Sequence, residues 1–120
     1  MNLKLRNVAD KGDPKKERLI IRVLNDTDLG EYILLRTGLT DGDVNIGVES
    51  AFWFPDKAIQ AGDLVVVYSR AGNTQEKKSD AGRTVHFFYW DQPNSIWKNR
   101  ETGVVLAHAP IWEAARAEDL

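Results

Sequence analysis

The sequence predicts a single all-β domain folded as an antiparallel β-sandwich, and three observations support that class. The chain has 120 residues, 42% of them hydrophobic and 28% charged, which is ordinary for one globular domain. Seven or eight short runs rich in β-branched and aromatic residues alternate with turn-forming residues. Only residues 111–117 have a helix-forming composition. We therefore expect one domain over residues 1–120, with the sandwich core at about 18–109.

The first strands are expected before residue 37. Residues 3–6 alternate apolar and charged side chains, as a short strand does, and this strand is expected outside the sandwich proper. Residues 18–24 form a strong β-prone run, which residues 25–28 end with side chains that favour turns. Residues 32–36 are expected to pair beside it. The glycines and aspartates of 37–47 then predict a long polar connection.

The middle of the chain gives the clearest strands. The aromatic run 52–54 and the β-branched run 64–68 flank a polar turn that contains Ala61-Gly62. Residues 71–82 are polar and charged and predict a second long surface loop. Residues 84–90 follow as a strand with bulky side chains on both faces.

The C-terminal part predicts one more strand and an end segment with two interpretations. Residues 99–103 read as a turn, and 104–108 as the last strand. After Pro110, residues 111–117 fit either a short helix or an apolar tail packed in extended form.

Charge and composition argue against several classes of function. The net charge is -2, so no overall basic field would hold a polyphosphate, and the clusters at 15–18 and 77–78 are short and mixed with acid. Nucleic acid is therefore not expected as a partner unless a local patch exists. The chain has no cysteine, which excludes disulfides and thiolate sites. No segment resembles a signal peptide or a membrane span, which favours an intracellular protein without a membrane partner, in a compartment that is otherwise unknown.

No metal or catalytic pattern is complete. Asp41, Asp43 and Asn45 have the spacing that begins a calcium loop, but Ile46 stands where such a loop needs glycine, and Phe52 where it needs glutamate. The two histidines, at positions 86 and 108, have no further ligands at metal-binding spacing. We expect no enzyme activity, no metal site and no cofactor.

Three short patterns resemble the immunoglobulin-like tail domain of lamins. They are the run 19–24 leading into Asn25, the pairs Phe54-Pro55 and Ala61-Gly62 before a β-rich strand, and the segment 97–106, which looks like a closing hairpin. The resemblance covers roughly residues 18–108 and implies an immunoglobulin-like sandwich that acts as a non-catalytic interaction or scaffold module. Gly30-Glu31-Tyr32 departs from the family, which has a Gly-Trp pair there.

The aromatic strand 84–90 is the candidate contact surface. Because strand side chains alternate, Val85, Phe87 and Tyr89 should face one side, and His86, Phe88 and Trp90 the other. The second side is covered either within the chain or by another protein. For the latter case we expect a protein partner, or self-association, through a surface made of Arg83, His86, Phe88, Trp90 and Arg100.

Two other functions remain open at this point. A sandwich that binds carbohydrate or another small ligand would stack it on exposed Trp53 and Trp90. A calcium-dependent adhesin or enzyme would use Asp41 and Asp43.

Overall fold

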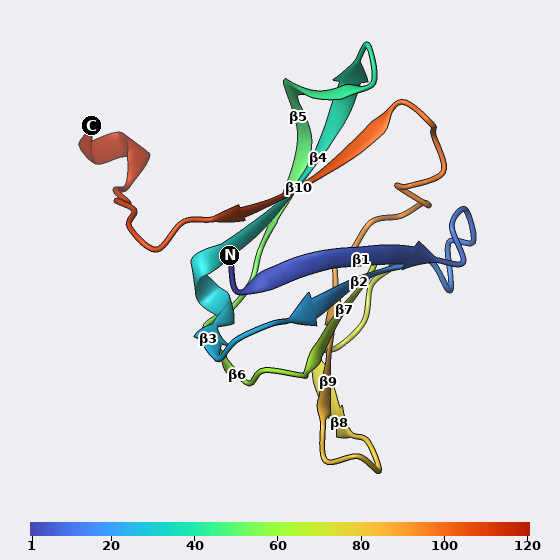
Figure 1. Cartoon of the computed structure of the whole chain (residues 1–120). Coiled ribbons are helices and arrows are strands. Elements are labelled where there is room, and N and C mark those ends of the chain that lie inside the picture. The colour runs from blue at the N-terminus through green and yellow to red at the C-terminus, as the bar shows by residue number, and fades with distance from the viewer.

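A computed structural model describes all 120 residues and contains no helix longer than a single 3₁₀ turn (Figure 1). Its ten strands are β1 (Leu3–Ala9), β2 (Arg18–Val23), β3 (Thr27–Asp28), β4 (Tyr32–Thr40), β5 (Asp43–Trp53), β6 (Ala58–Ile59), β7 (Leu64–Tyr68), β8 (Gln75–Lys78), β9 (Thr84–Tyr89) and β10 (Thr102–His108). The 3₁₀ turns are η1 (Leu29–Glu31) and η2 (Ala117–Asp119). None of these elements is a helix of the length and apolar character that a membrane crossing requires.

Two larger sheets and one small strand pair make up the fold. Five strands form one sheet in the order β1-β2-β7-β9-β8, three form a second in the order β10-β4-β5, and β3 pairs with β6. Neighbours are antiparallel except β7 and β9, which run parallel, and β8 pairs antiparallel with the other edge of β9. The predicted all-β sandwich is confirmed, with this parallel pair as a departure from a fully antiparallel arrangement.

The core lies between the two larger sheets. Side chains alternate along each strand, so pairing aligns inward residues in rows, one of which joins Ile21, Val65 and His86. The next inward row joins Leu19, Val67 and Phe88. The apolar residues of this cluster are Leu3, Leu19, Ile21, Val23, Leu29, Tyr32, Leu34, Phe54, Ile59, Val65, Val67, Phe88, Trp90, Ile96 and Trp97.

The expected place of one strand and two of the expected connections are wrong. Strand β1 is not outside the sandwich, since it pairs with β2 and buries Leu3 in the core. Residues 37–47 are not a long connection, because β4 and β5 continue through them as a hairpin closed at Asp41-Gly42, both in the left-handed region. Residues 71–82 contain β8, which pairs with β9.

The C-terminal segment is mostly extended. Residues 109–116 have no regular structure, and only η2 is helical, so the expected helix over 111–117 is wrong. The alternative of a packed extended tail holds only for the conformation, since Ile111 is 92% and Trp112 59% exposed. Its Trp112 packs edge-on against Trp53 with the ring centroids 4.8 Å apart. Beyond that contact the segment leaves the body of the molecule (Figure 1).

Candidate functional site

Strand β9 turns the expected contact residues inward. His86, Phe88 and Trp90 are 3%, 1% and 6% exposed. Phe52 and Phe54 pack against the Phe88 ring, with centroid distances of 6.3 and 5.3 Å. These three residues therefore cannot form a contact surface of the folded chain, and that part of the expected interface is wrong. The second sheet covers them, because facing sheets bury their inner sides against one another.

The carboxylate of Asp63 lies beside His86 in the core. The Nε2 atom of His86 lies 2.9 Å from Oδ2 of Asp63, which also accepts the backbone N–H of Gln60, while Oδ1 accepts that of Thr84. Burial alone would raise the pKa of Asp63, but these hydrogen bonds, that of His86 first, hold it below its ordinary value. Nδ1 of His86 has no hydrogen-bond partner within the chain.

A second buried carboxylate fixes the turn between β1 and β2. Glu17 is fully buried and accepts the hydroxyls of Ser69 and Ser95 at 2.5 and 2.7 Å. It also accepts the backbone N–H groups of Gly12, Ile96 and Trp97. Burial would raise the pKa of Glu17, but the hydrogen bonds, led by that of Ser69, lower it overall. The turn is thereby attached to the end of β7 and to the segment before β10.

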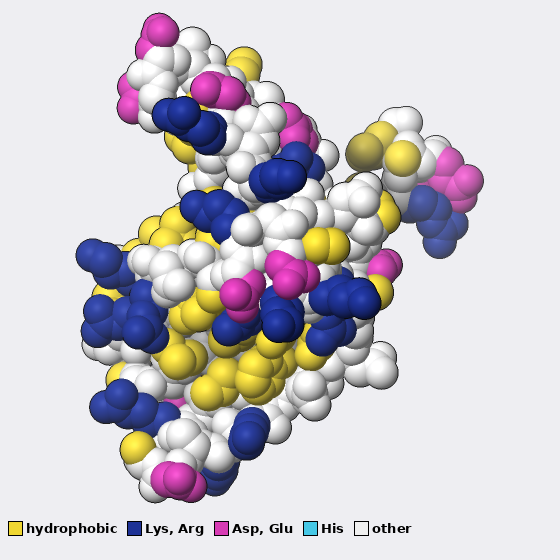
Figure 2. All heavy atoms as spheres, turned by 90° about the vertical axis from the view of Figure 1, so that its right-hand side faces the viewer, with side chains coloured by type: hydrophobic (Ala, Val, Ile, Leu, Met, Phe, Trp, Pro, Cys, Tyr) yellow, Lys and Arg dark blue, Asp and Glu magenta, His cyan; other side chains and the backbone are white.

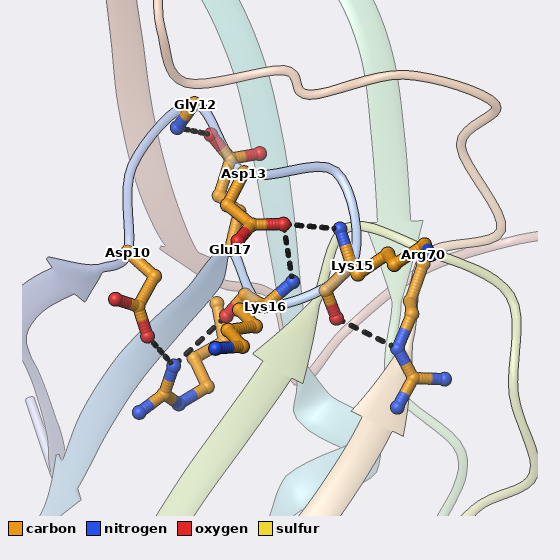
Figure 3. A network of polar contacts seen from close by, with 8 residues as sticks. Asp10, Gly12, Asp13, Lys15, Lys16, Glu17 and Arg70 are labelled. Carbon is orange, nitrogen blue, oxygen red and sulfur yellow. Dashed lines mark hydrogen bonds and ion pairs between the residues drawn. The ribbon is translucent and has the colours of Figure 1, made fainter.

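The same turn places cationic side chains at one end of the five-stranded sheet (Figure 3). Asp13 accepts the backbone N–H of Lys15 at 2.9 Å, and Arg70 donates to the carbonyl of Lys15 at 3.0 Å. Arg18 pairs with Asp10 at 2.6 Å.

The outer side of the five-stranded sheet, called the open sheet face below, is defined by its register. One row runs Lys4, Arg22, Leu64, Val85 and Lys77. The next rows run Asn7, Ile20, Val66, Phe87 and Gln75, and then Ala9, Arg18, Tyr68 and Tyr89. Aliphatic and aromatic side chains occupy the middle of each row, and cations lie mainly toward the β1 and β8 edges.

No strand of the second sheet covers the open sheet face, because that sheet packs on the inner side. The apolar residues of the open sheet face are only partly buried, except Val66, which is buried. Figure 2 shows this side of the molecule, where a patch of hydrophobic side chains reaches the surface between many lysine and arginine side chains. A charge-rimmed apolar patch of this kind is typical of a binding surface.

A groove at one end of the open sheet face, called the arginine groove below, has a volume of about 600 Å³. Arg6, Arg22 and Arg83 line it together with the apolar side chains of Leu64 and Val85. Arg6 reaches it from the β-bulge in β1, a feature that commonly redirects a side chain. None of the three arginines forms an ion pair or a side-chain hydrogen bond within the chain.

The only carboxylate that lines the arginine groove belongs to Asp63, which is turned toward His86 and two backbone N–H groups. Gly62 makes the turn into β7 with a φ of +92°, and it lies beside Arg83, since a Cβ there would be 3.5 Å from Nε of that side chain. The groove therefore has three cations without an internal counterion.

The other end of the open sheet face carries a stacked aromatic pair. The Tyr68 and Tyr89 rings are 5.3 Å apart and inclined by 12°, and the Arg70 guanidinium lies 4.9 and 5.0 Å from their centroids. These cation–π contacts fix the position of the guanidinium, together with the hydrogen bonds that its Nε and Nη1 atoms donate to the carbonyls of Lys15 and Ala71.

The two arginines of the expected interface lie apart. Arg83 lines the arginine groove, whereas Arg100 is exposed on the turn that precedes β10, in the other sheet. Their separation leaves Arg83 as the one member of the expected set that belongs to the open sheet face.

The residues of the alternative functions are also placed. Trp90 is buried, while Trp53 is 47% exposed and donates its indole N–H to the carbonyl of Gly30. Asp41 and Asp43 lie at the exposed β4–β5 turn, and no group of three or more potential ligands among His, Cys, Asp and Glu could hold a metal ion.

Comparison with known proteins finds no family model that matches the sequence and no curated protein that matches it. The resemblance to lamin tail domains stays a prediction.

The arginine groove was not found from the sequence, although one signal was present. Arg18, Ile20 and Arg22 alternate along a strand whose other residues are apolar, which gives that strand a cationic outer side. The positions of Arg6 and Arg83 beside it depend on a bulge and a turn, which no local pattern showed.

Proposed function

We propose that this chain is a non-catalytic binding module of β-sandwich type, as its resemblance to lamin tail domains implies, and that it holds its partner on the open sheet face. The observation that carries the proposal is the partly exposed apolar strip beside three arginines without counterions. The fold does not require either feature. A partner that covers the strip and neutralises the arginines would gain from both.

The positive charge of the open sheet face determines which class of partner suits it. Two copies that met through this face would bring like charges together, which costs free energy at an interface. The open sheet face therefore suits an anionic partner, and self-association would have to use an acidic surface of the second copy. Arg83 keeps the role expected from the sequence, while the outward residues Val85, Phe87 and Tyr89 replace the buried ones.

The alternative functions have less support. A sugar would have two exposed tryptophans, Trp53 and Trp112, but their rings already pack edge-on against each other, and Trp90 is buried. A calcium ion would have two turn aspartates and no third carboxylate.

The proposal is tested by NMR titration of the ¹⁵N-labelled protein with two anionic probes, a peptide of alternating glutamate and phenylalanine and a short oligothymidylate. Backbone amide shifts should change along β2, β7 and β9 with at least one probe, and not along β4, β5 and β10. The matched control is a peptide of alternating lysine and phenylalanine, which should leave the spectrum unchanged. If neither anionic probe shifts the open sheet face, the proposed function is wrong.

A further inference from the structure

We propose that the open sheet face is a binding site for single-stranded nucleic acid, with phosphates held in the arginine groove and bases laid along the apolar strip. This inference rests on the proposed function and names the partner class. It departs from the expectation set by the net charge of -2, which left nucleic acid open only if a local patch exists.

The arginine groove supplies that patch. Arg6, Arg22 and Arg83 come from three segments that are distant in sequence, and the fold brings them to one groove of about 600 Å³. Each guanidinium has its donors free of ion pairs and side-chain hydrogen bonds. Guanidinium groups bind phosphate oxygens through paired N–H donors, so the groove fits phosphates of a ligand backbone.

A second set of cations extends the site across the sheet. Arg18 and Arg22 are four residues apart on β2, which separates them by about 13 Å at the usual rise of a strand. Arg70 lies near Arg18 at that far end, over the tyrosine rings. Arg18 is ion-paired with Asp10, and Arg70 donates to the carbonyls of Lys15 and Ala71, so these two cations are partly satisfied within the chain and the arginine groove carries the strongest demand for anions. A ligand that meets the cations at both ends must carry negative charge at intervals along its length, as a nucleic-acid strand does.

The surface between the two ends is apolar. Val66 and Phe87 are paired neighbours at its centre, with Tyr68 and Tyr89 in the adjoining row. Bases stack on aromatic side chains and on guanidinium planes. Phe87 is the partly exposed aromatic ring of this strip, whereas Arg70 lies on the Tyr68 and Tyr89 rings and Gly72 packs against Tyr89. A duplex hides its base faces, so the arrangement favours a single strand. An acidic segment without aromatic side chains would match the cations but would leave the apolar strip uncovered.

The experiment is fluorescence anisotropy with a labelled oligothymidylate about 15 nucleotides long, at several salt concentrations between about 50 and 200 mM NaCl. With three phosphates in the arginine groove, the slope of log K against log salt should be about -2. Arg22→Gln should weaken binding and make the slope shallower by about 0.7, the share of one phosphate. Phe87→Ala should weaken binding about fivefold or more with the slope unchanged.

The matched control is Arg100→Gln, which makes the same charge change on the turn before β10 and should bind like the native chain. Arg83→Gln provides a second groove variant, and urea unfolding of every variant verifies that the fold is retained. The inference is overturned if the native protein does not bind at the lowest salt, if Arg100→Gln weakens binding as much as Arg22→Gln does, or if a duplex of equal length binds as tightly. Binding of the glutamate–phenylalanine peptide without the oligothymidylate would overturn the inference and leave the proposed function standing; binding of neither would remove both.

Discussion

The two sides of the five-stranded sheet differ in how far their apolar residues are buried and their charged groups are paired within the chain. On the inner side, aromatic and aliphatic residues are buried against the second sheet, and the carboxylates of Glu17 and Asp63 each accept several hydrogen bonds. On the outer side, apolar residues are only partly covered, and Arg22 and its two groove neighbours have no partner. Groups that serve the fold are satisfied within the chain, so the unsatisfied outer groups mark the side that is free to bind.

Four buried side-chain atoms depart from that rule. Nδ1 of His86 has no hydrogen-bond partner on the inner side of the five-stranded sheet, although Nε2 of the same ring meets Asp63 at 2.9 Å. The other three belong to the second sheet and are Nε of Arg36, Oγ1 of Thr37 and Oγ of Ser50. The contrast therefore holds between the two buried carboxylates and the groove arginines, and it does not extend to every polar group of the core.

The largest expected effect separates neighbouring residues of β9. Phe88→Ala removes a ring that is 1% exposed and should lower the free energy of unfolding by about 3–5 kcal/mol. Phe87→Ala, on the open sheet face, should lower it by about 1 kcal/mol because less surface leaves water there. Urea unfolding followed by tryptophan fluorescence measures both. Equal losses would mean that the outer side is packed as tightly as the inner one, against our description of the site.

The sequence was sufficient for the class of fold and for the alternation of β9, and it was insufficient for choosing the covered side. Both sides of residues 84–90 are bulky and largely apolar, so periodicity alone does not say which one faces the second sheet. That choice depends on Phe52 and Phe54, which reach Phe88 from the other sheet. The β4–β5 hairpin was missed because its glycines and aspartates look like a loop when cross-strand pairing is unknown.

The next effect concerns the inner polar groups. Glu17→Gln replaces one acceptor oxygen by an NH₂ group that faces existing donors, so some of the five hydrogen bonds must be lost. We expect a loss of about 2–3 kcal/mol in the free energy of unfolding, because hydrogen bonds to a charged group are involved. Glu101→Gln, at an exposed carboxylate, is the matched control and should change little. A neutral result for Glu17→Gln would show that the turn is not held by this carboxylate.

Lowering the pH should also reduce the free energy of unfolding, through the two carboxylates on the inner side. The pKa values of Glu17 and Asp63 are lowered by folding from ordinary values of 4.5 and 3.8. A carboxyl whose pKa is lower in the folded state contributes stability that is complete above its ordinary pKa and is lost as the pH falls through its folded-state pKa. Unfolding free energy should therefore decline below about pH 4.5, with a smaller decline in Glu17→Gln. Chemical unfolding between pH 7 and pH 2.5 measures it, and parallel curves for the two proteins would contradict the assignment.

The site shows a different limit of sequence reasoning. Arg22 could be placed on the outer side of its strand from alternation alone, but Arg6 and Arg83 meet it only through the β1 bulge and the turn at Gly62. Charge counted along the chain gave no basic patch, because the groove arginines are far apart in sequence. A patch built by tertiary structure is invisible to a search for consecutive cations.

The smallest expected effect has the opposite sign. Arg22→Gln removes one of three like charges that line the arginine groove, so it should raise the free energy of unfolding by up to about 0.5 kcal/mol at low salt. Arg18→Gln breaks the ion pair with Asp10 and should lower it by a similar amount. Both differences should shrink in high salt, which screens exposed charges. If Arg22→Gln stabilises the fold but weakens oligonucleotide binding, Arg22 serves binding and not folding. If Arg22→Gln destabilises the fold, Arg22 belongs with the inner groups that serve the fold.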